Sequence, residues 1–88
     1  MNKSSPLLSG QIRAARALLR WSAEELARAS SVGLTTIRRA ELAEADTSLT
    51  AANNLALRRA LEEAGVEFID ENGGGPGVRL AKGKKKGR

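Results

Sequence analysis

Few side chains in this sequence could carry out covalent or metal chemistry. The 88 residues include no cysteine and no histidine, which excludes thiol nucleophiles, imidazole bases, disulfides and nearly all transition-metal sites. Hydroxyl groups are present without a base near them in the pattern, and the carboxylates fall singly or in adjacent pairs typical of a solvated helix face. The glycine run at 73–75 lacks the following helix and lysine that phosphate-cradling loops use. We therefore expect no enzyme activity, cofactor, metal or small-molecule substrate.

The chemistry that remains is that of basic side chains, which are unevenly distributed. Residues 1–40 hold seven Lys or Arg against two acidic residues, residues 41–81 hold three against eight, and residues 82–88 hold five against none. The formal net charge is +5, which indicates anionic partners. Arg38 and Arg39 stand side by side within residues 1–40. What their side chains can reach depends on the helices around them.

A capping box begins one helix upstream of these arginines. Ser22 and Glu25 stand at the two positions of the box, and the apolar residues Trp21 and Leu26 occupy the positions of a hydrophobic staple. A helix is therefore predicted from Ser22, with Leu26 and Ala29 facing inward.

The helix that carries Arg38 and Arg39 is predicted at 34–43. Gly33 can serve as its N-cap, and Ile37 and Ala40 lie on its buried side at helical spacing. The connection between the two helices is only a few residues long, which is short enough to hold them at a steep angle as in a helix-turn-helix. The spacing fits an ordinary corner of two helices equally well.

Further helices are predicted on both sides of this unit. Upstream, Ser9 or Gly10 can cap a first helix after a flexible arm of residues 1–9. Downstream, Thr50 can cap a long helix that ends at Gly65. Its apolar stripe consists of Leu57, Ala60, Leu61 and Ala64.

After Gly65 the apolar residues no longer follow helical spacing. Apolar and β-branched residues flank the glycine-rich segment DENGGGPG, a pattern that predicts a β-hairpin at 66–80. A basic tail at 81–88 is expected to be disordered. The predicted fold is mainly α: a four-helix helix-turn-helix domain at 10–65, followed by a short C-terminal β-hairpin.

The segment RAARALLRWSAEELARASSVGLTTIRRAE resembles the Xre or phage-repressor (Cro-like) family of helix-turn-helix DNA-binding domains. The segment LRRALEEAGVEFIDENGGGPGVRL also resembles the tail of many small bacterial members. The residues that match the family pattern are Arg16, Ser22, Glu25, Leu26, Ala27, Val32, Thr36, Ile37, Arg39 and Glu41.

The resemblance implies a sequence-specific DNA-binding transcriptional regulator, a repressor, that reads the major groove with helix 34–43. It assigns base contacts to Leu34, Thr35 and Arg39, and base or backbone contacts to Arg38. The two helix starts, Ser22 and Gly33, would approach phosphates.

Two other groups of charged residues have expected roles. The resemblance pairs Arg16 with Glu41 as a buried structural ion pair. The tail lysines would add sequence-independent affinity for duplex DNA because each can neutralise a phosphate. These lysines are Lys82, Lys84, Lys85 and Lys86.

The sequence departs from the family pattern at four positions. Ala23 stands where a DNA-contacting glutamine is common, and Gly33 replaces the usual serine cap. Ser31 and Arg20 stand where glycines are usual. Because two phosphate contacts would be lost, a second interpretation stays open. In this interpretation the domain binds protein. It would act as an antagonist that docks on another regulator through its acidic part, residues 41–81, or as an antitoxin-like partner.

A homodimer is expected through the C-terminal hairpin, whose edges would carry Val66, Phe68 and Val78, or through the long helix beside it. The alternative is a hairpin folded back on its own long helix. The sequence contains no apolar stretch long enough for a membrane helix and no secretion signal, so we expect a cytoplasmic protein.

Overall fold

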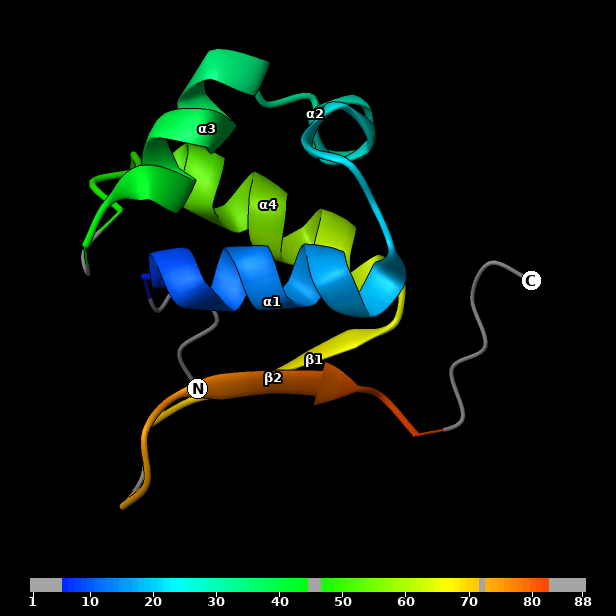
Figure 1. Cartoon of the computed structure of the whole chain (residues 1–88), viewed down its shortest axis with the longest axis vertical. Coiled ribbons are helices and arrows are strands. Elements are labelled where there is room, and N and C mark those ends of the chain that lie inside the picture. Colours follow the sequence, from blue (N-terminus) through cyan, green and yellow to red (C-terminus); the bar gives the residue numbers. More distant parts are fainter. Residues whose placement is uncertain (1–5, 45–46, 72, 83–88) are drawn as a thin grey trace.

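The computed structural model describes residues 6–44, 47–71 and 73–82, and it confirms the predicted mainly α fold with a C-terminal hairpin. Figure 1 shows α1 lying between the hairpin on one side and α2 and α3 on the other, with α4 behind it. None of the described helices is long and apolar enough to cross a membrane. The elements are α1 (Ser9–Leu19), α2 (Ala23–Ser30), α3 (Leu34–Leu42), α4 (Ala51–Glu63), β1 (Val66–Ile69) and β2 (Gly77–Leu80).

Local capping groups explain where the helices begin and end. The Ser22 hydroxyl accepts a hydrogen bond from the Glu25 backbone N–H at 3.0 Å, and the Glu25 carboxylate accepts one from the Ser22 N–H at 2.7 Å. Thr50 caps α4 by accepting from the Asn53 N–H at 3.1 Å. Gly65, with φ at 115°, follows the end of α4 in a conformation that glycine adopts without strain. These predicted signals are confirmed.

The first helix begins at Ser9 with Leu8 as its N-cap, so the prediction that Ser9 or Gly10 caps it is wrong. Gln11 reaches back so that its Oε1 accepts from the Leu8 N–H at 2.9 Å. Leu7 is fully buried, and its backbone bonds the Asn54 side chain at 2.9 Å and the Thr47 hydroxyl at 3.2 Å. The predicted flexible arm at 1–9 is therefore wrong for its last three residues, while residues 1–5 lie outside the described part.

The core is built almost entirely from aliphatic side chains, contributed by all four helices, by the segment before α1, by the turn after α2 and by β1. Its largest fully buried members are Leu7, Ile12, Leu26, Ile37, Leu57 and Leu61. Ala29, expected to face inward, is exposed, and Ala23 is buried in its place. α2 is therefore rotated about its axis, so that its inward side carries Ala23, Leu26 and Ala27 and not Ala29.

The hairpin folds back onto α1 and α4 of its own chain. β1 and β2 are antiparallel with Val66 opposite Leu80 and Phe68 opposite Val78. Because Val66 and Phe68 are buried in the core and Val78 packs against it, the expectation that these side chains form an exposed edge is wrong. The sequence could not show that α1 would cover them.

A buried arginine on α4 packs against the hairpin. Arg58 on α4 is 6% exposed, and its guanidinium carbon lies 5.0 Å from the centre of the Phe68 ring, within the range of a cation–π interaction. Its charge is balanced by Glu62 at 3.3 Å and Asp70 at 3.6 Å. The predicted apolar stripe of α4 thus includes a charged residue that sequence reasoning missed.

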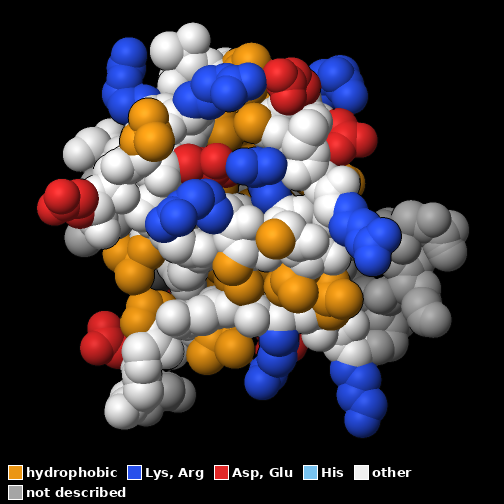
Figure 2. Space-filling view, in the orientation of Figure 1, with side chains coloured by type: hydrophobic (Ala, Val, Ile, Leu, Met, Phe, Trp, Pro, Cys, Tyr) orange, Lys and Arg blue, Asp and Glu red, His pale blue; other side chains and the backbone are white. Residues whose placement is uncertain are grey.

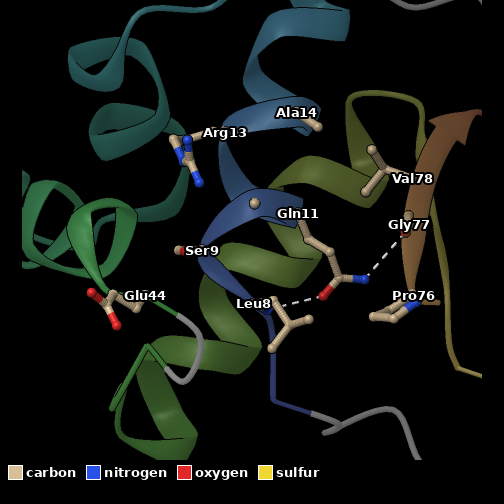
Figure 3. Close-up of a pocket in the computed structure, with 10 residues that line it drawn as sticks. Leu8, Ser9, Gln11, Arg13, Ala14, Glu44, Pro76, Gly77 and Val78 are labelled. Atoms are coloured by element: carbon tan, nitrogen blue, oxygen red, sulfur yellow. Dashed lines mark hydrogen bonds between the residues drawn. The ribbon is translucent and has the colours of Figure 1, made fainter.

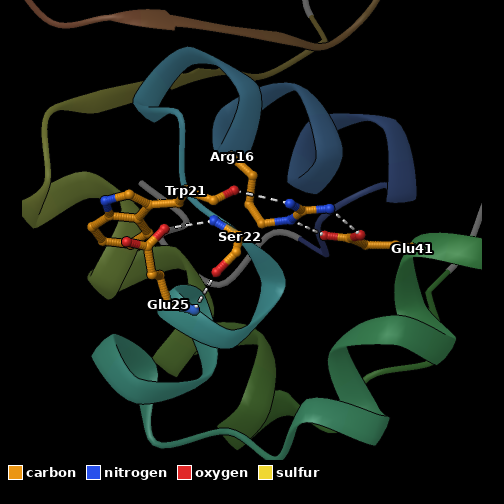
Figure 4. Close-up of polar contacts among 5 residues, drawn as sticks. All are labelled: Arg16, Trp21, Ser22, Glu25 and Glu41. Atoms are coloured by element: carbon orange, nitrogen blue, oxygen red, sulfur yellow. Dashed lines mark hydrogen bonds and ion pairs between the residues drawn. The ribbon is translucent and has the colours of Figure 1, made fainter.

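One ion pair connects α1 to the end of α3 (Figure 4). Arg16 donates from Nε to Glu41 Oε2 at 2.7 Å and from Nη2 to Oε1 at 2.8 Å, and its Nη1 donates to the Trp21 carbonyl at 2.9 Å. The Glu41 side chain is 10% exposed. Hydrogen bonding to Glu41 raises the pKa of Arg16 above its ordinary value. The predicted pair is confirmed.

Removing the carboxylate should destabilise the whole domain. We expect Glu41→Ala to lower the free energy of unfolding by about 3 kcal/mol, because Arg16 would keep a largely desolvated charge without its partner. Urea denaturation followed by circular dichroism measures this difference. The exposed Glu44 provides the control, since Glu44→Ala should change stability by less than about 0.5 kcal/mol. Equal losses in the two variants would contradict a structural role for the pair.

Candidate nucleic-acid interface

The turn between α2 and α3 is short and internally bonded. Ser31 ends α2 in the left-handed conformation at φ 64°, and its N–H donates to the Ala27 carbonyl at 2.8 Å. The Ser30 hydroxyl donates to the Leu26 carbonyl at 2.7 Å and accepts from the Val32 N–H at 3.1 Å. Val32 is 5% exposed and anchors the turn in the core. These contacts fix how α3 projects from the body.

α3 presents one ridge of polar side chains to solvent. Thr35 and Arg39 stand four residues apart and are both exposed, while Ile37 and Ala40 on the opposite side are buried. Arg39 also lines an open hollow between α3 and the start of α4, together with Thr50. The ridge can therefore offer a guanidinium fork and a hydroxyl to the same ligand.

Arg38 lies to the other side of this ridge and is held by α2. Its Nη2 donates to the Glu24 carboxylate at 3.0 Å, and both side chains are more than half exposed. The pKa of Glu24 is lowered, chiefly by a hydrogen bond from its own backbone N–H at the helix start, with the charge of Arg38 adding to the effect. Arg38 thus points toward α2 in the free protein, and its charge is partly compensated there.

The starts of the two helices differ in what they offer. The Ser22 hydroxyl accepts the capping hydrogen bond and also bonds the Glu24 carboxylate, so a ligand would have to compete for its proton. Gly33 is exposed and its missing side chain leaves the first turn of α3 open, since a Cβ there would meet only the Thr36 hydroxyl at 4.0 Å. Leu34 is half-buried and packs against the core, so only part of it can touch a ligand.

The described start of the basic tail does not lie beside α3. Lys82 follows the hairpin, which lies on the opposite side of α1 from α3 (Figure 1). Ala81 belongs to the hairpin, because its N–H donates to the Gly65 carbonyl at 2.7 Å, so the predicted disordered tail at 81–88 begins too early. Lys84, Lys85 and Lys86 lie outside the described residues. Figure 2 shows Lys and Arg side chains over several elements with acidic side chains among them.

Two of the sequence's departures from the family pattern fall at special backbone positions. Ser31 and Arg20, which stand where glycines are usual, have φ values of 64° and 59°. The left-handed region favours glycine because a Cβ there crowds the backbone. The third departure, Ala23, has its side chain in the core, so this position presents no polar group to a ligand.

A second hollow lies between α1 and the start of β2 (Figure 3). Gln11 lies in it, and its polar atoms are already used: Oε1 accepts from Leu8, and Nε2 donates to the Gly77 carbonyl at 3.2 Å. Within the described ranges no three acidic, histidine or cysteine side chains cluster as metal ligands would. Gln11 therefore fastens the hairpin to α1, and the charged side chains that line the hollow are those of Arg13 and Glu44.

Comparisons with protein-family models, with curated proteins and with solved structures give no match to this chain.

The strain at Ser31 can be tested directly. We expect Ser31→Gly to stabilise the domain by up to about 1 kcal/mol, because glycine adopts this φ without the Cβ clash, less the entropy it adds to the unfolded chain. Thermal unfolding is the measurement. The neighbouring Ser30→Gly is the matched control and should destabilise, since Ser30 is helical and its hydroxyl bonds the turn. Stabilisation by both variants, or by neither, would contradict this assignment.

Proposed function

We propose that this chain is a sequence-specific DNA-binding regulator of the Xre type that inserts the start of α3 into the major groove. The observation that carries the proposal is the exposed ridge of Thr35 and Arg39 beside the open first turn at Gly33. Arginine can bind guanine through two parallel hydrogen bonds, and a threonine hydroxyl or methyl can contact a neighbouring base. The backbone N–H groups of the first turn suit a phosphate.

The support behind α3 fits this role. A helix that reads bases must keep its angle when it meets DNA, and α3 is fixed at its start by the bonded turn and at its end by the pair of Glu41 with Arg16. The left-handed conformations at Ser31 and Arg20 agree with the glycines expected from the resemblance. If the bound domain keeps other proteins off the same DNA site, the regulator is a repressor. It would act in the bacterial cytoplasm.

The roles of the other basic groups follow from their positions. Arg38 would leave Glu24 to reach the DNA backbone, because the two are exposed and their attraction is screened by solvent. Lys82 and the following basic residues would add sequence-independent affinity if the DNA extends past the domain. Specificity would then rest chiefly on Arg39.

A second candidate function is protein binding, as an antagonist of another regulator or an antitoxin-like partner. It is favoured by Leu42, which is 83% exposed at the end of α3 beside the acidic Glu44. Selection of bound sequences from a random duplex library separates the two functions. Failure to enrich any sequence at low salt would favour the protein partner over DNA.

Arg39 should discriminate between bases. With a duplex obtained from that selection, we expect Arg39→Ala to lose about 1–3 kcal/mol of specific binding, while affinity for random duplex changes little. Fluorescence anisotropy at two salt concentrations measures both affinities. Arg79→Ala removes the same charge from the hairpin and should leave both nearly unchanged. An equal loss on specific and random duplex would mean that Arg39 contacts only phosphate.

Glu24 should restrain DNA binding. We expect Glu24→Gln to bind both specific and random duplex severalfold more tightly at low salt, because Arg38 is released and a negative charge is removed from beside α3. The gain should shrink as salt rises. Glu63→Gln, which removes the same charge from the end of α4, is the control. If both variants bind like the wild type, Arg38 does not lie near the DNA.

A further inference from the structure

The hollow between α1 and β2 has two chemically different sides. Its volume of about 520 Å³ lies within the range of small-molecule sites. Figure 3 shows Ser9, Arg13 and Glu44 on one side of the start of α1. Pro76 and Val78 of the hairpin lie on the other side. One side of the hollow can therefore bind charged groups, while the other can cover an aliphatic group.

Ser9 brings a buried hydroxyl group to the charged side. The residue is only 2% exposed, and it lines the hollow. The side-chain hydrogen bonds at this end of α1 are made by Gln11, and among the described residues none reaches Ser9 Oγ. Buried polar groups are nearly always hydrogen-bonded, because an unpaired one costs free energy. A polar ligand in the hollow would supply the missing partner.

Arg13 lies one turn further along α1, with its guanidinium over the open position of Gly10. A Cβ at Gly10 would be 4.0 Å from Arg13 Nη2. The first turn of α1 contains no acidic residue, so no side chain of that turn balances the partial positive charge of the helix start. Guanidinium groups bind carboxylates through charge-assisted hydrogen bonds. The charged side of the hollow is therefore suited to a carboxylate.

Glu44 supplies the opposite charge on the same side. It follows the end of α3, and both it and Arg13 are exposed. Figure 3 shows no bond between the two, and neither forms an ion pair with another described residue. A ligand with only a carboxylate would be repelled by Glu44. A ligand that carries a carboxylate and an ammonium group close together would match both charges.

The apolar side is held in place before any ligand arrives. Leu8, Pro76 and Val78 are each half-buried, so part of each side chain still faces water. Gln11 fastens this wall to α1 by donating to the Gly77 carbonyl at 3.2 Å. An aliphatic group that covers these side chains removes apolar surface from water, which is favourable.

We propose that this hollow binds a free α-amino acid with a branched aliphatic side chain, such as leucine. The carboxylate accepts hydrogen bonds from Arg13 and Ser9, the ammonium group lies against Glu44, and the side chain packs on Pro76 and Val78. Binding stabilises the folded chain by mass action, because the site exists only when α1, the end of α3 and β2 are assembled. An effect on DNA affinity would rest on the proposed function, whereas binding itself does not.

The first test compares ligands without DNA, so that its result is independent of the proposed function. Titration of the full chain with L-leucine at millimolar concentration, followed by NMR, should give saturable shifts at Ser9, Arg13 and Val78. N-acetyl-L-leucine lacks the ammonium group and L-leucinamide lacks the carboxylate. Each should bind about tenfold more weakly or worse, because one charged contact is lost.

The two analogues also represent the two ends of a peptide. If either of them binds as tightly as leucine, the site takes a peptide end and the proposal for a free amino acid is overturned. The absence of saturable shifts with leucine would overturn the site itself. Glycine should bind more weakly than leucine, since it has no side chain to cover Pro76 and Val78.

Charge variants provide the second test. Arg13→Met should weaken leucine binding about tenfold or more. Arg28→Met is the matched control, because Arg28 is equally exposed on α2 and does not line the hollow. Glu44→Gln should weaken the binding of leucine but not that of N-acetyl-L-leucine, which has no ammonium group. Equal leucine affinities of the two arginine variants, or a loss of both ligands in Glu44→Gln, would contradict the assigned contacts.

The buried hydroxyl separates a role in binding from a role in folding. We expect Ser9→Ala to have an unchanged or higher Tm without ligand, because its hydroxyl has no hydrogen bond to lose. The same variant should bind leucine severalfold more weakly. Thermal unfolding with and without leucine measures both effects, and the circular dichroism spectrum checks the fold. Unaltered leucine affinity would overturn the role of Ser9.

Discussion

The bidentate pair between Arg16 and Glu41 fixes the position of α3, and the rest of the molecule depends on that position. α3 is only nine residues long and contributes few apolar side chains to the core, so packing alone would hold it weakly. The guanidinium reaches from α1 to the end of α3 and also bonds the Trp21 carbonyl, which joins three segments through one side chain. An ion pair that is mostly shielded from water has narrow geometric requirements, and it therefore specifies one angle between the helices.

α1 is the element that separates the two outer surfaces. Its arginine side faces α3 through Arg16, whereas its other side, marked by Gln11 and Leu18, faces β2. A chain this short buries only about two-thirds of its unfolded surface. The hairpin therefore completes the core by adding Val66 and Phe68.

DNA would be read by α3, whose exposed ridge carries Thr35 and Arg39. Arg38 is the residue whose role depends on both states, since it bonds Glu24 in the free protein and has to exchange that partner for a phosphate. This exchange costs little, because an exposed ion pair contributes at most about 1 kcal/mol.

The sequence by itself determined the elements whose signals are local. The capping groups at Ser22 and Thr50, the glycine after α4 and the strands around the glycine-rich turn act within a few residues, so their effect can be read without a fold. Even the pair of Arg16 with Glu41 was predicted, although only through the resemblance. Tertiary structure alone decided that Ala29 is exposed, that Leu7 is in the core and that Arg58 is buried beneath the hairpin. Burial is a property of two segments that meet from distant parts of the chain, and the pattern of one segment does not reveal which other segment will cover it.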